Sequence, residues 1–172
     1  ALEEAASQAD CIISTGGVSV GEEDHVKAAV EAVGRLELWK LAIKPGKPFA
    51  SGKVGDTQFF GLPGNPVSAF VTLVMLVRPC LLTMLGCDKP LATPLLVPSG
   101  FEKGETGQRQ EYIRAHLTKN ASGTTQLVPF DNQSSGVATS LSRADGLAII
   151  PPYSSVAPGD YLEFISFSEL LE

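Results

Sequence analysis

The stretch CIISTGGVSVGEED, residues 11–24, decides how the rest of this chain is expected to fold. A short apolar run leads into Ser-Thr-Gly-Gly, and a helical pattern begins after Gly21. This order predicts a strand, a glycine-rich turn and a helix, an arrangement in which backbone N–H groups and a helix N-terminus can hold an anion. An ordinary strand-to-helix connection produces the same pattern, so the turn on its own leaves both interpretations open.

The residues after this turn continue an α/β pattern. Apolar residues at helical spacing predict a helix over residues 23–33, and the apolar run 36–43 predicts one buried strand. A hairpin-like insertion and a strand over 58–62 come next, followed by a helix from Pro66 to about Leu85. We therefore expect an α/β fold with part of a doubly wound, mostly parallel sheet.

The character of the sequence changes near Cys87. Beyond it the apolar runs are short and β-like, and turns separate them, which predicts a small β domain or barrel. The chain is therefore expected to consist of part of an α/β domain over residues 1–87 and a small C-terminal β domain over residues 88–172. In the second unit, strands are expected over residues 95–97, 110–118, 124–129, 146–150 and 161–167.

Composition and charge exclude several classes of protein. The chain has 172 residues, 44% of them hydrophobic, so it can bury a core. Its net charge of −6 argues against a nucleic-acid partner. No apolar run approaches the roughly 18 residues that span a bilayer, so no membrane partner is expected. The 3 cysteines lack metal-ligand spacing, which predicts buried thiols in a reducing compartment.

Positive charge is concentrated in one region of this acidic chain. Between Leu38 and Gly55 every charged residue is a lysine, which predicts a local anion site. Lys44 and Lys47 bracket a Pro-Gly turn, so both ammonium groups can converge on one small anion. Solvated loop lysines are the alternative.

Three loops follow the predicted strands, at residues 15–24, 44–48 and 63–68. In open α/β sheets ligands bind beyond the carboxyl ends of the strands, so we expect these loops to meet around one ligand. In the second half, the turn 133–136 is a candidate nest for an oxyanion. Arg109 is a further candidate, although it shares a strand face with Glu111 and a simple ion pair between the two is the alternative.

Three multi-residue stretches carry a family resemblance. TGGVSVGEED (15–24), KPGKP (44–48) and GLPGNPVSA (61–69) resemble signature stretches of the molybdopterin molybdenumtransferases. Residues 109–115 and 133–146 resemble the C-terminal β domain of the same family. The resemblance implies a molybdopterin-binding-like fold and a cytoplasmic, homodimeric enzyme. Its implied reaction takes adenylylated molybdopterin and molybdate and releases molybdenum cofactor and AMP with Mg²⁺.

The resemblance also implies roles for individual residues of this sequence. Asp24, Lys44 and Lys47 are the implied catalytic residues, with Asp24 also supporting the Mg²⁺ ion. Arg109 and Ser135 are the implied contribution of the β domain to holding molybdate. The full set implied to bind the pterin nucleotide or the oxyanion is Thr15, Gly16, Gly17, Ser19, Pro48, Pro63, Asn65, Pro66, Ser68, Arg109 and Ser135.

Members of this family are longer than the present chain, which begins without an initiator Met and resembles their C-terminal part. The N-terminal domains of the same protein are therefore expected partners. Two alternative functions remain. The related molybdopterin adenylyltransferase shares the Thr-Gly-Gly loop but resembles a lone α/β domain. A scaffold or receptor-binding module, as in the animal relative gephyrin, would require an exposed apolar groove between the two domains.

Overall fold

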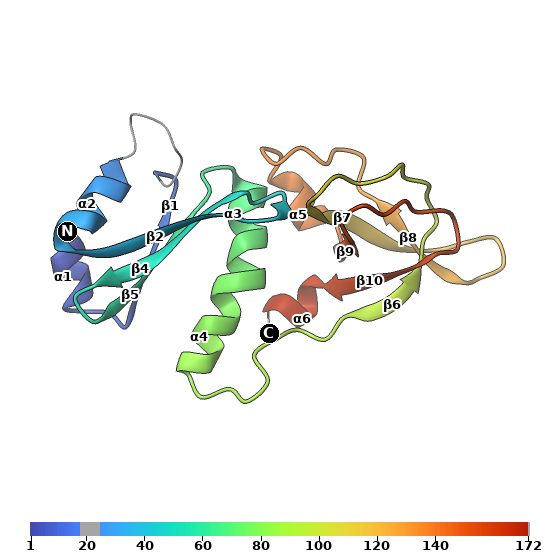
Figure 1. Ribbon diagram of the computed structural model, residues 1–172. Coiled ribbons are helices and arrows are strands. Elements are labelled where there is room, and N and C mark those ends of the chain that lie inside the picture. Colours follow the sequence, from blue (N-terminus) through green and yellow to red (C-terminus); the bar gives the residue numbers. More distant parts are fainter. Residues whose placement is uncertain (18–24, 172) are drawn as a thin grey trace.

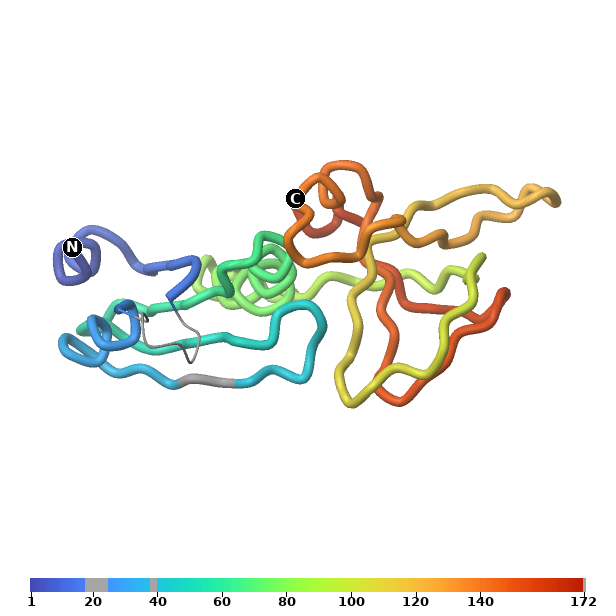
Figure 2. The backbone as a smooth tube through the Cα atoms, turned by 90° about the horizontal axis from the view of Figure 1, so that it is seen from above, coloured from blue at the N-terminus to red at the C-terminus, as the bar shows by residue number. Residues whose placement is uncertain are grey.

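The computed structural model of the chain describes residues 1–17 and 25–171 (Figure 1). It contains two sheets, and one long helical stretch lies between them (Figure 2). This confirms the α/β fold class with a second, β-rich part. The predicted division into units 1–87 and 88–172 stays a prediction.

The first sheet has the strand order β1-β5-β4-β2. Its strands are β1 (Cys11–Thr15), β2 (Gly34–Lys40), β4 (Pro48–Val54) and β5 (Thr57–Leu62). Only β1 and β5 pair in parallel; β4 is antiparallel to both β5 and β2. The expectation of a mostly parallel sheet is therefore wrong for the described strands. The reason is that the predicted hairpin is part of the sheet: β4 is joined to β5 by the short turn at Gly55–Asp56 and lies between β5 and β2.

Apolar residues alternate between the two faces of this sheet. Phe59 is buried with Val30 on the face that is covered by helices α1 (Leu2–Ala6) and α2 (His25–Val33). Phe60, the next residue, is buried on the opposite face with Phe49, Leu62 and Val77. Successive strand residues point to opposite faces, so one apolar run serves two helical layers.

The helical stretch between the sheets consists of three consecutive elements. These are α3 (Pro66–Thr72), a π-helical turn η1 (Leu73–Val77) and α4 (Arg78–Met84). By length and composition alone this 19-residue stretch could cross a membrane, which differs from the expectation drawn from the sequence. Its buried residues Val67, Val71 and Val74 pack against the second sheet, while Val77 packs against the first. Its first two elements, α3 and η1, thus pack between the sheets, whereas α4 has no buried residue.

The second sheet has the order β3-β7-β9-β10-β6, with β8 pairing with β7. The bounds of its strands are β3 (Ile43–Lys44), β6 (Leu95–Pro98), β7 (Gln110–Lys119), β8 (Thr125–Pro129), β9 (Gly146–Ile150) and β10 (Tyr161–Ser166). The sheet closes toward a barrel because Ser99 bridges to Leu127 and the Gly100 N–H donates to the Leu127 carbonyl at 2.8 Å. Two short helices, α5 (Thr139–Arg143) and α6 (Phe167–Leu171), flank it. The five strands predicted in this half are confirmed.

The predicted strand over residues 36–43 is divided between the two sheets. β2 ends at Lys40, and β3 starts at Ile43 and pairs in parallel with β7 of the second sheet. In Figure 2 the cyan loop that joins β2 to β4 reaches toward the barrel. The loop 44–48 is thereby placed at the junction of the two sheets.

The cysteines depart from the expectation of buried thiols. Cys11 is half-buried, whereas Cys80 and Cys87 are exposed. Burial, and to a lesser degree the nearby Cys80, raises the pKa of the Cys11 thiol, so it stays protonated near neutral pH.

Candidate functional site

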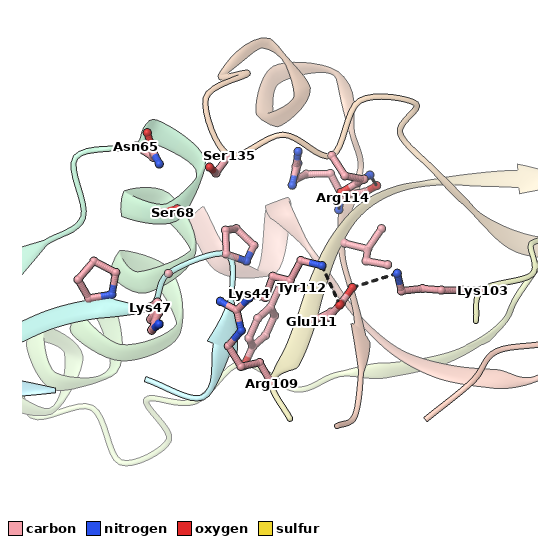
Figure 3. A pocket seen from close by; sticks show the side chains of 15 residues that line it. Lys44, Lys47, Asn65, Ser68, Lys103, Arg109, Glu111, Tyr112, Arg114 and Ser135 are labelled. Atoms are coloured by element: carbon pink, nitrogen blue, oxygen red, sulfur yellow. Dashed lines mark hydrogen bonds and ion pairs between the residues drawn. The ribbon is translucent and has the colours of Figure 1, made fainter. Parts of the chain in front are cut away.

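A pocket of about 400 Å³ opens between the first turn of α3, the loop 44–48 and strand β7 (Figure 3). The segment 133–135, which precedes α5, forms a further wall. Each wall comes from a different part of the chain. The pocket therefore depends on the contact between the two sheets through β3 and the central helix.

Two of the three predicted strand-end loops contribute to this pocket. Lys44, Lys47 and Pro48 line it from the first loop, and Asn65 and Ser68 line it from the second. The predicted meeting of these two loops is thus seen in the structure.

The described start of the third predicted loop, residues 15–17, lies beside the second loop. The Gly16 N–H donates to the Leu62 carbonyl at 2.9 Å, and a Cβ added to Gly64 would lie 3.6 Å from the Gly16 Cα. At this distance the added Cβ would make an ordinary van der Waals contact, so the two turns lie side by side. Thr15, Gly16 and Gly17 therefore sit next to Pro63 and Gly64 at the carboxyl ends of β1 and β5. They do not line the pocket itself.

Two predicted residues, Ser19 and Asp24, lie outside the described part of the chain. Within residues 1–17 and 25–171, no group of three His, Cys, Asp or Glu side chains is arranged to hold a metal ion. Pro66 is exposed at the first turn of α3 and does not line the pocket.

Glu111 on β7 joins two lysines at the edge of the pocket. Its Oε1 lies 3.0 Å from the Lys44 Nζ and its Oε2 lies 3.1 Å from the Lys103 Nζ, as Figure 3 shows. The parallel pairing of β3 with β7 places Lys44 directly beside Glu111. Burial by itself would raise the pKa of Glu111, but the hydrogen bonds and charges of both lysines outweigh burial and hold the pKa below its usual value. The predicted alternative of an Arg109–Glu111 ion pair is therefore wrong among the described contacts.

Arg114 is a buried cation on the pocket wall that sequence reasoning missed. Its side chain is only 1% exposed. The guanidinium donates to the Ser140 Oγ at 3.1 Å and to the carbonyls of Asn132 and Ser134 at 3.0 and 3.1 Å. All of these described acceptors are neutral. Burial lowers the Arg114 pKa, but an arginine stays charged at neutral pH.

Arg114 also fixes the segment that carries Ser135. The Arg114 backbone N–H donates to the Gln133 Oε1 at 3.1 Å, and the Gln133 Nε2 donates back to the Arg114 carbonyl at 2.8 Å. The Ser135 carbonyl in turn accepts from the Val67 N–H at 3.1 Å, at the first turn of α3. The segment 133–135 is thus held between β7 and the helix. The signal in the sequence was a lone arginine inside the apolar strand Tyr-Ile-Arg-Ala.

Ser68 supplies an unused polar group at the start of the central helix. The residue is 5% exposed and lines the pocket. Its hydroxyl has no hydrogen-bond partner among the described residues, although a buried hydroxyl ordinarily has one. The N-terminus of a helix favours negative charge, because the first N–H groups and the helix dipole point toward it. Ser68 is therefore suited to donate to an anion in the pocket.

The charges of the pocket are unbalanced. One carboxylate, that of Glu111, lines it among the described residues, and it faces a larger number of cations. The cationic side chains on the wall are Lys44, Lys47, Lys103, Arg109 and Arg114. This set of ammonium, guanidinium and hydroxyl donors suits a small oxyanion with two negative charges.

Comparisons with known proteins identify the family that this chain resembles. Residues 1–83 match a family model described as a probable molybdopterin binding domain, and residues 101–167 match one described as the MoeA C-terminal region (domain IV). The chain is 58% identical over 82 residues to a molybdopterin molybdenumtransferase from Haemophilus influenzae. It is 32% identical over 154 residues to the enzyme of the same name from Bacillus subtilis.

Each alignment covers only part of the relative. The Haemophilus alignment covers 48% of this chain and 20% of that relative, and the Bacillus alignment covers 88% of this chain and 35% of that relative. A crystal structure of a molybdopterin biosynthesis MoeA protein from Pyrococcus horikosii superposes with a TM-score of 0.72 and 26% identity. It covers 96% of this chain and 39% of that chain. The chain therefore spans well under two thirds of the proteins it resembles.

Proposed function

Because the chain belongs to the molybdopterin molybdenumtransferase family, we propose that it takes part in inserting molybdenum into adenylylated molybdopterin, giving molybdenum cofactor and AMP. The names of the matching relatives support a role in molybdenum cofactor biosynthesis. Since the chain spans only part of those relatives, the N-terminal domains of the same protein are proposed to complete the site.

The observation that carries this proposal is the donor set of the pocket. Arg114 holds a buried positive charge with neutral acceptors only, and the buried hydroxyl of Ser68 has no described partner. Molybdate is a tetrahedral dianion that needs a small cluster of cationic and hydroxyl donors. We propose that it binds between these two groups, with Ser135, Lys44 and Arg109 around it.

The pterin nucleotide is proposed to lie along the neighbouring loops. Thr15, Gly16 and Gly17 sit against Pro63 and Gly64, so both loops offer backbone at one edge of the sheet. Ser19, Pro48, Asn65 and Pro66 would extend this surface. Glycine leaves no Cβ between such a backbone and a phosphate.

Lys44 and Lys47 are the proposed catalytic groups of this chain. Release of AMP breaks a phosphoanhydride, and negative charge develops on the phosphate oxygens as it breaks. Two ammonium groups on the wall between the oxyanion and the loops would stabilise that charge. Mg²⁺ is implied by the family resemblance, with Asp24 as its ligand; the described residues contain no matching cluster, and we assign no step to it.

The remaining elements of the proposal rest on the resemblance. We propose that the protein works in the cytoplasm as a homodimer. The adenylyltransferase alternative is disfavoured because residues 101–167 match the MoeA C-terminal region and supply much of the pocket wall. The scaffold alternative is disfavoured because the pocket between the two sheets carries a cluster of cationic side chains, which suits an anion better than an apolar receptor segment.

Binding of molybdate to the chain, measured by titration calorimetry, tests this function. Ser68→Ala should weaken molybdate binding by roughly tenfold or more, because a hydrogen bond to a charged group contributes about 1.5–3 kcal/mol. Ser142→Ala, an exposed serine on α5 whose hydroxyl bonds the Thr139 carbonyl, is the matched control and should bind like the unaltered chain. Failure of the unaltered chain to bind molybdate would contradict the proposal.

A further inference from the structure

Glu111 is an unexpected residue for an anion pocket. It is 8% exposed, it lines the pocket, and both of its carboxylate oxygens are engaged by lysines. A negative charge so close to the proposed oxyanion repels it. The same carboxylate also neutralises part of the charge of Lys44, one of the cations that would bind the anion.

The geometry sets how close the two negative charges come. The Glu111 Oε1 lies 3.0 Å from the Lys44 Nζ. An anion that accepts a hydrogen bond from the same Nζ would lie about 3 Å from that nitrogen, so it would be within about 6 Å of the carboxylate. Repulsion between like charges at that range in a partly buried site weakens an affinity by more than tenfold.

The two lysines differ in their freedom to leave Glu111. The Lys44 side chain is 53% exposed and the Lys103 side chain is 31% exposed. The backbone of Lys103 is fixed by two hydrogen bonds of 2.9 Å with Val156 of the barrel. Lys103 can therefore remain as the counterion of Glu111 while Lys44 turns toward an anion.

We propose that Glu111 competes with the bound oxyanion for Lys44 and thereby keeps oxyanion binding weak. This inference rests on the proposed function. Insertion requires the metal to leave its first binding position for the pterin. Tight binding of the incoming anion would lower its ground state and raise the barrier to that transfer. Glu111 acts as a positioning residue. It holds both lysines at the pocket wall and limits how tightly the oxyanion binds before the transfer.

Titration calorimetry of the chain with molybdate and with sulfate tests the inference. Glu111→Gln keeps the shape and an acceptor for one lysine but removes the negative charge. We expect it to bind both anions at least tenfold more tightly, a change of about 1.4 kcal/mol. A residue with a purely structural role would give the opposite sign, because its loss would disorder the lysines and weaken binding.

Glu105→Gln is the matched control. Glu105 is an exposed glutamate two residues from Lys103, and it does not line the pocket. Its replacement removes the same charge, and we expect binding within twofold of the unaltered chain. Binding by a folded Glu111→Gln variant that is unchanged or weaker would overturn the inference. Absence of binding by the unaltered chain would instead contradict the proposed function itself.

A measurement on the unaltered chain covers the case in which the Glu111→Gln variant does not fold. The pKa of Glu111 can be followed by carboxyl carbon NMR with and without sulfate, which stays a dianion over the range of the titration. If the anion draws Lys44 away, the pKa of Glu111 should rise toward its ordinary value, because one of the hydrogen bonds that lower it is lost. A pKa that sulfate leaves unchanged would overturn the inference.

Discussion

Replacing Gly46 with alanine should damage both the fold and the pocket. Gly46 lies between Lys44 and Lys47, the two lysines proposed to be catalytic. It is buried and has φ of 120°, a conformation that residues with a Cβ rarely adopt. An added Cβ would lie 2.8 Å from the Thr72 Oγ1 and 3.0 Å from the Ile43 Cδ1. Glycine at this position therefore lets the loop 44–48 rest directly on the central helix.

The expected loss of folding stability in Gly46→Ala follows from two separate effects. The backbone conformation contributes about 1–3 kcal/mol of strain for a residue other than glycine. Crowding against Thr72 and Ile43 contributes a further 1–3 kcal/mol, since the surrounding core must move. We expect the free energy of unfolding to fall by about 2–6 kcal/mol, measured by urea denaturation, and molybdate binding to weaken because Lys44 and Lys47 shift.

A second glycine separates the two effects. Gly55 has φ of 58°, and an added Cβ would meet no atom within 4 Å. Gly55→Ala should therefore show the backbone effect alone, about 1–2 kcal/mol, and leave molybdate binding unchanged. If Gly46→Ala proved no more destabilising than Gly55→Ala, the close contact between this loop and the helix would be refuted.

Three further predictions address the core, the ion pairs and the loop outside the described residues. Val71→Ala, in the packing between the central helix and the second sheet, should lower the free energy of unfolding by about 2 kcal/mol in urea, and a loss below 0.5 kcal/mol would contradict that packing. The lowered pKa of Glu111 stabilises the fold above the ordinary glutamate pKa of about 4.3, and this contribution is lost as the pH falls through the folded-state pKa. When the pH is lowered, the free energy of unfolding should therefore fall less steeply in Glu111→Gln than in the unaltered chain. Glu102 is exposed, so Glu102→Gln should behave like the unaltered chain. Equal pH dependence in all three proteins would exclude the ion pairs of Glu111. In a full-length relative, the substitution equivalent to Asp24→Ala should abolish Mg²⁺-dependent AMP release and leave binding of the pterin nucleotide intact. Normal AMP release would instead leave Asp24 with a helix-capping role.

Much of the fold follows from local patterns in the sequence. The strands of the second half were predicted within two residues at each end, because turns rich in glycine, proline and asparagine separate their short apolar runs. Pairing direction was predicted less well. Whether a strand joins its neighbour in parallel depends on the path of the chain between them. The hairpin-like insertion was expected from the sequence, but its first strand, β4, lies inside the sheet and pairs antiparallel with both neighbours.

The site was predicted in part for similar physical reasons. The loops at 44–48 and 63–68 were expected to meet because strand-end loops share one edge of a sheet. Arg114 and Lys103 were missed because their roles depend on tertiary contacts: a buried arginine inside an apolar strand, and a loop lysine brought to Glu111 by the barrel. The split of residues 36–43 between two sheets was also invisible to periodicity, since both halves are apolar and extended.

Backbone and side-chain NMR of the chain during a titration with molybdate tests the central claim most directly. The oxyanion is proposed to bind between Arg114, Ser68 and Ser135. The largest shifts should therefore occur at the Arg114 Nε–H and at the backbone amides of the pocket loops, which are those of Lys44, Gly46, Lys47, Asn65, Val67, Ser68 and residues 133–135. Shifts confined to other surfaces, or no shifts at millimolar molybdate, would contradict the assignment of this pocket as the oxyanion site.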